Sequence, residues 1–452
     1  MAFIRKIKKK SGTYLAEVEG YRSGGKVMQR VLRYLGKEIN GRAEKRVLAS
    51  EIQVKNVKRS LDVLAIDSIA RELHLTLLKN KYLLALIYSQ VLEKRSINKL
   101  EEWMFFTEIP EILGIKQVST KELYESLGDT DEAEMKTIND ELYKVFRKCD
   151  ESFDAAVIDV TDTYFEGTHV NIKRRKGKES KTKKLIQIGL AVTFKHGLPL
   201  FHRKYHGNLN NDSIFKDMVL ELQSRNLDCI IVDRGMTSSE NITLAKKLNV
   251  KIIAGIKRTA TEIKDHIATI KREEIYTFEN RVQLKNTAVF VTTFPYEEGT
   301  LIVVYNPALE VVKKEQIFET GEHITDKYVG YSTIYHNTSY SAADVVKKYY
   351  DKEIVERAFK QLKGILTLRP IRVWLKNHVE GHINICYLAY AILAYMNYKL
   401  QKTNTTATEA LNSLKHGYKI TLGVAKEEWS LHVPLEPKQK QLLKAIGVVY
   451  KK

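Results

Sequence analysis

The chain has 452 residues, 44% of them hydrophobic, which is enough for two to four domains with at least one sizeable core. Lys and Arg total 74 against 55 Asp and Glu, and the net charge of +19 favours a polyanionic partner. The opening MAFIRKIKKK lacks the apolar core of a signal sequence, and the longest apolar run, from Ile383, is too short and too polar to span a bilayer. With three widely spaced cysteines that form neither a disulfide framework nor a zinc pattern, we expect a cytosolic rather than a secreted or membrane protein.

Residues 1–40 predict a small basic β-hairpin unit. The segments TYLAEVEGY and KVMQRVLRYLG alternate around a turn at Ser23, Gly24 and Gly25. The alternation exposes five cations, namely Lys8, Lys9, Lys10, Arg30 and Arg33. This pattern suits either phosphate contacts or an ordinary solvated hairpin.

From residue 41 to 150 the pattern is helical. Apolar residues recur at helical spacing in the segments Leu61 to Leu78, Tyr82 to Leu92, Ile97 to Phe106 and Met135 to Phe146. Ser119 with Glu122 predicts a capped helix through Leu127 that Gly128 ends. Short capped helices among many lysines indicate a DNA-binding domain, but a generic α-bundle has the same pattern.

At Asp154 the composition changes to strands. Three strands are predicted, in AAVIDVTDTYFEG, LIQIGLAVTFKHG and PLFHRKYHG, and a tight turn at His196-Gly197 joins the last two. A helix from about Asp212 to Gln223 comes before the apolar CIIVD, a buried central strand that ends at Asp233, and a Ser-capped helix and the strand KIIAGIK follow. Three antiparallel strands followed by helix, strand, helix and strand are the element order of a ribonuclease-H-like α/β core.

The rest of the chain adds three segments to this core. TAVFVTTF and TLIVVYN predict a β-rich insertion, and the segment Tyr349 to Lys363, which has no Pro or Gly, predicts one amphipathic helix. We therefore expect five parts: a β-hairpin unit (1–40), a helical domain (41–150), a ribonuclease-H-like catalytic core (151–258 and 340–400), a β-rich insertion (259–339) and a helical C-terminal tail (401–452).

Two aspartates stand out in the predicted core. Asp159 lies inside an otherwise apolar strand, where a carboxylate is costly unless it is paired or metal-bound, and Asp233 lies at the carboxyl end of the central strand. The first and fourth strands of this layout are neighbours, so the two carboxylates should face one another. Asp162 and Glu166 are alternative acids, although Asp162 should point to the other face of its strand.

The predicted helix supplies a third carboxylate. Seven-residue spacing places Tyr349, Glu356 and Lys363 in one line along the helix, and Lys352 joins that line one turn before Glu356. Taken alone, this line also fits a solvated face of ordinary ion pairs. Oxygen ligands without Cys or His favour Mg²⁺ or Mn²⁺, and three carboxylates can hold two ions about 3.5–4 Å apart.

A basic run, KRRKGKESKTKK, lies between the first two core strands. It includes Arg174 and Arg175 and suits contact with a DNA backbone, although a solvated loop has the same composition.

The motifs IDVTDTYFEG, IIVDRGM and Tyr-x2-Lys-x3-Glu-x6-Lys resemble those of bacterial insertion-sequence DDE transposases, in the branch with a Tyr-Arg-Glu-Lys signature. The stretches TYLAEVEGYR, HGN and RPIRVW…GHINICYLAY extend the resemblance along most of the chain. The resemblance implies that Asp159, Asp233 and Glu356 are the catalytic, metal-binding triad. It also implies that Tyr349, Lys352 and Lys363 contact transposon-end DNA. Lys352 stands where the signature has Arg, so the charge is kept and the bidentate fork is lost.

The implied function is transposition. The protein would bind the terminal inverted repeats of its own element as a homodimer in a synaptic complex, cut the double-stranded DNA with Mg²⁺ and join the 3′ hydroxyl to target DNA. Some members of the branch hold a flipped base with a tryptophan of the insertion; this insertion has no tryptophan, and Phe294 and Tyr296 are candidates for that role. A structure-selective nuclease of the same fold and a non-catalytic DNA-binding descendant stay open as alternatives.

Overall fold

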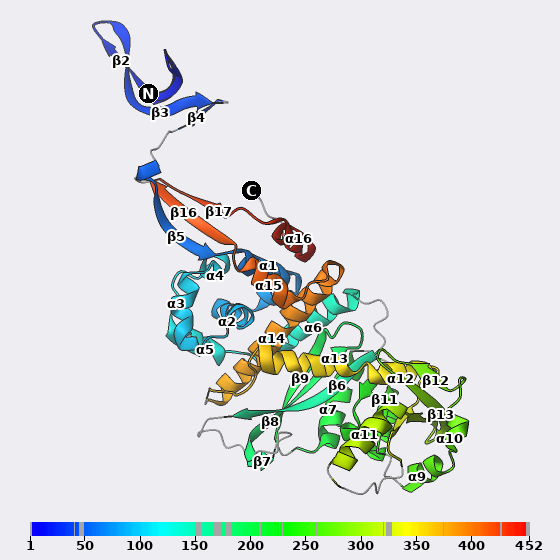
Figure 1. Cartoon of the computed structure of the whole chain (residues 1–452). Helices are drawn as coiled ribbons and strands as arrows, with labels where there is room; N and C mark the ends of the chain where they lie inside the picture. The colour runs from blue at the N-terminus through cyan, green and yellow to red at the C-terminus, as the bar shows by residue number, and fades with distance from the viewer. Residues whose placement is uncertain are drawn as a thin grey trace. The chain divides into compact units, whose positions relative to one another are not determined.

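The computed structural model describes residues 2–39, 41–44, 49–149, 155–165, 174–176, 182–207, 209–225, 227, 229–257, 261–319, 321, 328–373, 375–424 and 427–448. The protein is a mixed α/β protein (Figure 1) with two compact units, Met1–Lys58 with Gly417–Pro434, and Arg59–His416 with Leu435–Lys452. Among the described helices, none is long and apolar enough to cross a membrane.

The first unit contains two small antiparallel sheets. One has the order β1 (Ala2–Lys9), β2 (Gly12–Ser23), β3 (Lys26–Ile39) and β4 (Arg42–Glu44), and the other joins β17 (Glu427–His432), β16 (Tyr418–Val424) and β5 (Gln53–Arg59). β2 and β3 form the predicted hairpin. Its two-residue loop has φ of 57° at Gly24 and 77° at Gly25, values that glycine adopts without strain.

The C-terminal tail differs from the prediction of a helical segment. The two stretches that carry helical spacing do form helices, α15 (Ala407–Leu414) and α16 (Pro437–Ile446). Between them the hairpin of β16 and β17 pairs with β5 from the other end of the sequence. The aromatic and β-branched residues of YKITLGV favour this pairing.

Six helices open the second unit. They are α1 (Leu61–Glu72), α2 (Lys81–Leu92), α3 (Leu100–Phe105), α4 (Ile109–Leu113), α5 (Thr120–Leu127) and α6 (Glu132–Cys149). α5 has the predicted caps, because the Ser119 hydroxyl accepts a hydrogen bond from the Glu122 amide and Gly128 follows the last turn.

Short 3-10 turns occur along the chain. They are η1 (Ala49–Glu51), η2 (Leu75–Leu77), η3 (Ile97–Lys99), η4 (Arg234–Met236) and η6 (Gln401–Thr403).

A ten-stranded mixed sheet forms the centre of the second unit. Its strands are β6 (Ala155–Phe165), β7 (Arg174–Lys176), β8 (Thr182–Thr193), β9 (Pro199–His206), β10 (Cys229–Val232), β11 (Lys251–Ile256), β12 (Arg281–Gln283), β13 (Ala288–Tyr296), β14 (Gly299–Tyr305) and β15 (Tyr331–His336). Their order is β12-β13-β14-β15-β11-β10-β6-β8-β7, and β9 also pairs with β8.

The pairing of the core strands confirms the predicted neighbours. β6, β8 and β9 are antiparallel, whereas β10 lies parallel to both β6 and β11. The segment predicted as a β-rich insertion extends the same sheet, because β15 pairs antiparallel with β11. That segment also contains the helices α9 (Thr261–Ala268), α10 (Arg272–Ile275) and α11 (Pro307–Glu319).

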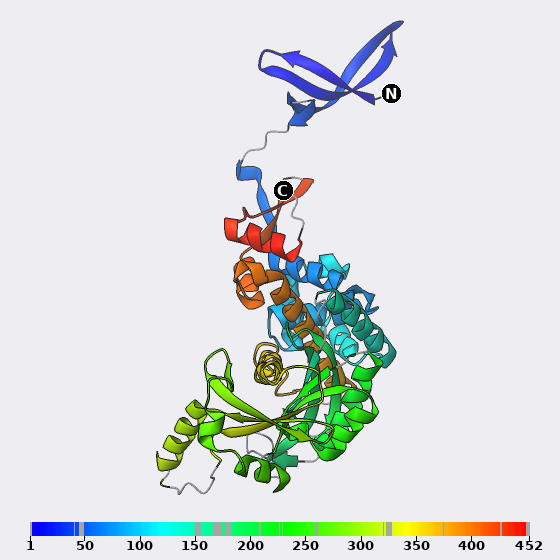
Figure 2. The ribbon, with the colours of Figure 1, turned by 90° about the vertical axis from the view of Figure 1, so that its right-hand side faces the viewer.

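Helices cover both faces of the central sheet. Ile158 and Val232 pack with α7 (Asn211–Ser224) and α8 (Ser239–Lys247). Val157 and Ile231 face the other way and pack in one core with α12 (Ala342–Tyr350), α13 (Glu353–Lys360) and α14 (Lys376–Leu400). Figure 2 views α12 and α13, in yellow, nearly end-on beside the sheet. Burial on both faces explains why CIIV is wholly apolar.

The prediction of one continuous helix from Tyr349 to Lys363 is wrong. α12 ends at Tyr350, α13 begins at Glu353, and Gln361–Ile365 form the π-helical segment η5. At the junction the Lys352 amide donates to the Tyr349 carbonyl at 3.3 Å, a three-residue rather than a four-residue step. Lys352 keeps backbone angles in the helical region (φ −58°, ψ −12°), so the interruption is a local change in hydrogen bonding that the sequence does not predict.

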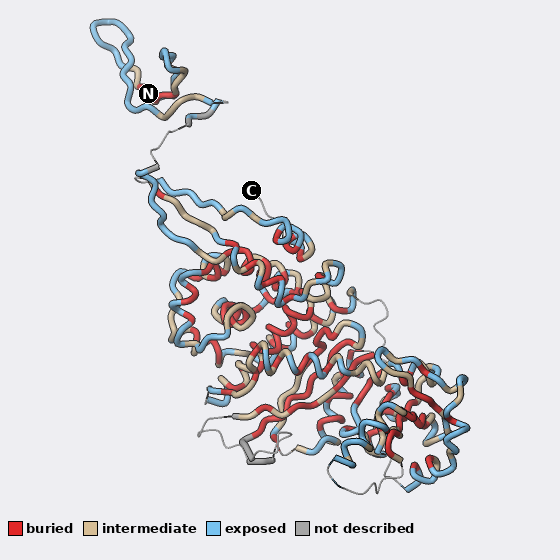
Figure 3. The backbone as a smooth tube through the Cα atoms, in the orientation of Figure 1, coloured by how far each residue is buried: buried red, intermediate tan, exposed pale blue. Residues whose placement is uncertain are grey.

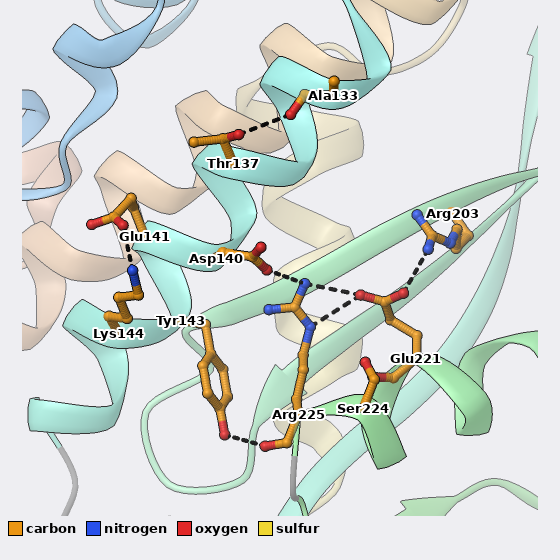
Figure 4. Close-up of polar contacts among 10 residues, drawn as sticks. All are labelled: Ala133, Thr137, Asp140, Glu141, Tyr143, Lys144, Arg203, Glu221, Ser224 and Arg225. Atoms are coloured by element: carbon orange, nitrogen blue, oxygen red, sulfur yellow. Dashed lines mark hydrogen bonds and ion pairs between the residues drawn. The ribbon is translucent and has the colours of Figure 1, made fainter.

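A buried arginine joins the helical region to the central sheet (Figure 4). Arg225, after α7, binds Glu221 at 2.9 Å and Asp140 of α6 at 3.2 Å, and its carbonyl accepts a hydrogen bond from the Tyr143 hydroxyl. Arg203 of β9 binds the other oxygen of Glu221 at 2.7 Å. Arg225 is only 8% exposed, and its two carboxylate partners offset the cost of burying its charge.

Candidate active site

The register of two parallel strands brings Asp159 and Asp233 together. Ile158 of β6 pairs with Val232 of β10, and each aspartate is the next residue along its strand direction. Neighbouring strands lie about 4.8 Å apart, so the two carboxylates start from adjacent backbone positions. The predicted proximity of these two strands is thus present in the structure.

The two aspartates belong to the face of the sheet that α13 covers. Side chains alternate along a strand, and Asp159 and Asp233 have the same parity as Val157 and Ile231. Those two residues share a core with the buried face of α13. The carboxyl edge of β6 and β10 therefore lies beside the helix that carries Glu356.

Asp233 is held by two residues of the junction between α12 and α13. The Lys352 ammonium donates to Asp233 Oδ1, and the Tyr349 hydroxyl donates to the same oxygen at 3.4 Å. The ammonium also lies 4.4 Å from the centre of the Tyr349 ring, which adds a cation–π contact. Lys352 therefore faces the sheet edge from the junction, where α12 has ended and α13 has not yet begun.

The contact of Lys352 with Asp233 is a charged pair at neutral pH. Burial at the sheet edge opposes ionisation of Asp233, but the hydrogen bond and charge of Lys352 outweigh it and hold the carboxyl pKa below its ordinary 3.8. Burial likewise opposes the ammonium, whereas its contacts with Tyr349 and Asp233 raise the Lys352 pKa. The site therefore already accommodates a cation on Asp233.

A glycine in β11 makes room for Tyr349. A side chain on Gly255 would collide with the Tyr349 phenol, so a residue with a Cβ there would displace the ring. Burial is also the main reason why the pKa of Tyr349 is raised, which keeps its hydroxyl protonated as a donor. Sequence reasoning missed this contact, since nothing in KIIAGIK points to a tyrosine about 94 positions later in the chain.

Glu356 lies on the exposed side of α13. Val355, Ala358 and Phe359 are its buried neighbours, and the helix packs on β6 and β8. Among the described residues, no three His, Cys, Asp or Glu side chains are grouped as metal ligands. The structure thus brings the two aspartates together and leaves Glu356 as a nearby carboxylate outside a formed ligand cluster.

Lys363 lies near the same strand through η5. Its ammonium donates to the Thr161 hydroxyl, two residues beyond Asp159 on the same face of β6, and it lies 5.8 Å from the Phe359 ring. Two residues of strand span about 7 Å, so Lys363 lies close to the carboxylates. No local pattern around Thr161 predicts its hydrogen bond with Lys363, which lies about 200 residues later in the chain.

The donor set fits a hard divalent cation. Asp159 and Asp233 are oxygen donors at adjacent backbone positions of two neighbouring strands, and the described residues contain no group of three His, Cys, Asp or Glu side chains that would favour zinc. Lys352, a positive group on Asp233, shows that this edge stabilises positive charge.

Several predicted residues lie elsewhere or outside the description. Arg174 and Arg175 have their backbone in β7, but their side chains lie outside the described part of the structure, as does Glu166. Asp162 has the parity of the opposite face of β6, as predicted.

The two aromatic residues considered for base contacts pack within the sheet extension. The Phe294 ring lies 4.8 Å from His266, and the Tyr296 ring lies 6.1 Å from Tyr335. Both rings are partly buried against the core formed by α9 and β14. Their role in DNA contact stays a prediction.

Comparison with known proteins gives one family match. Residues 151–392 match the model of a family described as a transposase DDE domain, a range that covers more than half of the 452 residues. Among solved structures, the chain resembles the cryo-EM structure of a piggyBac transposase synaptic complex with hairpin DNA at 13% identity and a TM-score of 0.45, over 78% of this chain and 76% of that chain. No curated protein matches the sequence.

Proposed function

The chain belongs to the family of transposase DDE domains, and on that basis we propose that it is a DNA transposase that binds the terminal inverted repeats of its own mobile element and catalyses metal-dependent DNA cleavage and strand transfer. The observation that carries the proposal is the register of β6 and β10, which supports a carboxylate pair of Asp159 and Asp233 at the edge beside α13. The partner is double-stranded DNA, in agreement with the net charge of +19.

The proposed catalytic residues are Asp159, Asp233 and Glu356. Together they hold Mg²⁺ or Mn²⁺, and two such ions activate an attacking oxygen and stabilise the leaving oxygen of a phosphodiester. Tyr349 and Lys352 bind DNA next to the carboxylates. When DNA enters, Lys352 exchanges its carboxylate partner for a phosphate oxygen, which leaves Asp233 available as a ligand.

We extend the proposal to the fold and the assembly. The strand order β9-β8-β6-β10-β11, with α7 and α8 as the connecting helices, supports a ribonuclease-H-like core. Because transposition needs both ends of an element in one complex, the active species is a homodimer. Arg174 and Arg175 remain candidates for contact with the DNA backbone.

The decisive experiment separates three activities of the purified chain. Linear DNA with the inverted repeats that flank the coding region is incubated with Mg²⁺, and a second reaction supplies pre-cut ends with a target plasmid. A transposase cuts the first substrate and joins the second to the target, and both activities disappear with EDTA and in Asp233→Ala. Cutting without joining would indicate a nuclease, and binding without either reaction would indicate a non-catalytic DNA-binding protein.

A matched pair on α13 tests the third carboxylate. Glu356→Gln should abolish cutting, whereas Glu353→Gln, which neutralises an exposed acid one turn earlier, should leave cutting within about twofold of the parent. Equal loss in both variants would contradict a ligand role for Glu356, because it would point to the charge of the helix as a whole.

A further inference from the structure

A pocket of about 340 Å³ lies in the second unit, and the segment that follows η5 forms one of its walls. Its walls come from α2 and the following loop Glu93–Ile97, from the segment Thr367–Val373 that follows η5, and from α5 and α14. The Gln90 amide donates to the Leu366 carbonyl at 2.6 Å and to the Thr367 hydroxyl at 3.1 Å, which fixes the two main walls to one another. The pocket is therefore a built feature of the unit.

The lining combines apolar walls with a cationic rim. Apolar side chains include Leu86, Ile97, Leu100, Leu127 and Ile385. The cations are Lys94, Arg95, Arg369 and Arg372. Among the described lining residues Glu93 is the one carboxylate, and it lies 3.4 Å from both Arg59 and Arg95, so the formal charge of the described lining is positive. An occupant of complementary chemistry has an anionic group and an apolar, ring-like body.

The backbone ties this pocket to the strand of Asp159. The Thr163 hydroxyl donates to the Leu368 carbonyl at 3.2 Å, and the Ile371 amide donates to the Tyr164 carbonyl at 3.0 Å. The four residues from Asp159 to Thr163 span about 13 Å of strand. At about 3.4 Å of rise per nucleotide, this distance corresponds to about four nucleotides of one DNA strand.

We propose that this pocket binds one nucleotide of the DNA strand that enters the carboxylate edge, about four nucleotides from the reacting phosphodiester. The phosphate lies on Arg369 and Arg372, and the sugar and base lie against the apolar walls. The volume falls at the lower end of the range for small-ligand sites, which suits a single nucleotide. We rest the DNA source of this nucleotide on the proposed function; a free nucleotide has the same chemistry.

The first test measures binding rather than cutting, so a failure of the proposed catalysis does not affect it. A fluorescent oligonucleotide duplex with a single-stranded extension is titrated with full-length protein in EDTA at several salt concentrations. Arg369→Gln/Arg372→Gln should weaken binding by about tenfold or more and reduce the salt slope by about two. The control Lys264→Gln/Lys313→Gln removes two charges from exposed positions of α9 and α11 and should change binding by less than about twofold.

A steric variant separates the pocket from a merely basic surface. Ser96 is an exposed residue of the rim, and Ser96→Trp fills the opening without changing the charge. This variant should unfold at the parental temperature and weaken DNA binding by at least about fivefold. Parental affinity in Ser96→Trp, or equal losses in the two charge variants, would overturn the proposal.

Thymidine monophosphate distinguishes the two sources of the nucleotide. If the site serves the DNA strand, millimolar thymidine monophosphate competes weakly with the oligonucleotide in the parent and not in Ser96→Trp. If the free nucleotide stabilises the parent against heat while both sets of pocket variants keep parental DNA affinity, the assignment to the DNA strand is refuted.

Discussion

The central sheet of the second unit and the four-stranded sheet of the first unit contain similar β-branched and aromatic residues but bury them differently (Figure 3). In the central sheet Ile158 is 1% exposed and Ile231 is fully buried. In the four-stranded sheet Phe3 is 44%, Val27 70% and Tyr34 48% exposed. The register of the central sheet is therefore fixed by burial on two faces, and that register brings the two aspartates together.

The four-stranded sheet buries only a few apolar side chains, among them Ala16 and Val18 of β2, and adds contacts on its surface. Arg30 binds Glu19 and Arg33 binds Glu17, each at 2.7 Å across β2 and β3, and Lys9 lies 4.2 Å from the Tyr34 ring. Exposed pairs of this kind contribute at most about 1 kcal/mol each. Side-chain packing therefore holds the central sheet in place on both faces, whereas the four-stranded sheet depends much less on packing.

The largest effect should come from the carboxyl edge of the central sheet. Asp159→Asn keeps the shape of the side chain and removes its charge, so DNA cleavage should fall by roughly a thousandfold or more. Arg30→Gln in the four-stranded sheet should leave the cleavage rate at saturating DNA nearly unchanged. Cleavage of a labelled duplex checks both, and a loss of similar size in Arg30→Gln would remove the functional distinction between the two sheets.

The second-largest effect should be on stability, because the two sheets differ in how deeply they bury their apolar side chains. Ile231→Ala should reduce the free energy of unfolding of the second unit by about 2–5 kcal/mol, because it leaves a cavity between two buried layers. Val27→Ala should change stability by less than about 0.5 kcal/mol, since its side chain is 70% exposed. Urea unfolding curves measure both values. If Val27→Ala were as costly as Ile231→Ala, the face of β3 would be covered in solution and the comparison would fail.

Two strand glycines, Gly255 in β11 and Gly20 in β2, provide a further test because the space around them differs between the two sheets. Gly255→Ala should destabilise the protein by about 1–3 kcal/mol, because the new Cβ must displace the Tyr349 ring. Gly20→Ala in β2 meets no atom within 4 Å, and it should be neutral or slightly stabilising. Thermal unfolding compares the two variants. Equal melting temperatures for Gly255→Ala and the parent would mean that Tyr349 does not pack on β11.

The smallest predicted effect is the pH dependence of the Asp233 pair. The folded carboxyl has a pKa below its ordinary 3.8, so the pair stabilises the fold above that pH and loses its contribution as the pH falls through the depressed value. Because the Asp233 side chain is 53% exposed, the contribution is at most about 1 kcal/mol.

Lys352→Met measures this contribution by urea unfolding at pH 6 and pH 3. The stability difference between the variant and the parent should be larger at pH 6 than at pH 3. Lys264→Met, at an exposed position of α9, is the control and should show no such change. A difference that stays constant with pH in Lys352→Met would exclude a charged pair at this edge.

Local sequence predicted most of the core elements because their signals are local. The apolar CIIV forms β10, Ser119 and Gly128 bound α5, and Gly24-Gly25 close the hairpin of β2 and β3. The neighbours β6 and β10 followed from the order of the elements, because the connection rules of α/β sheets leave few topologies. The family resemblance agrees with the match to the transposase DDE domain, whereas its branch stays a prediction.

The break between α12 and α13 shows the limit of that reasoning. Tyr349 to Lys363 has good helix propensity throughout, yet α12 ends at Tyr350 and α13 begins at Glu353, and the Lys352 side chain between them binds Asp233. The two strands β16 and β17 escaped prediction for a similar reason, since their partner β5 lies more than 350 residues away.

Local sequence was enough to predict the strands β6 and β10, the caps of α5 and the two aspartates at the carboxyl edge, because hydrophobic period and turn chemistry act between residues close in the chain. Tertiary contacts determine three further features: the partner of Asp233, the space that Gly255 leaves for Tyr349, and the pocket lined by α2 and the segment after η5. Those features arise where segments distant in the sequence meet, and the free energy of such contacts depends on residues from several segments at once.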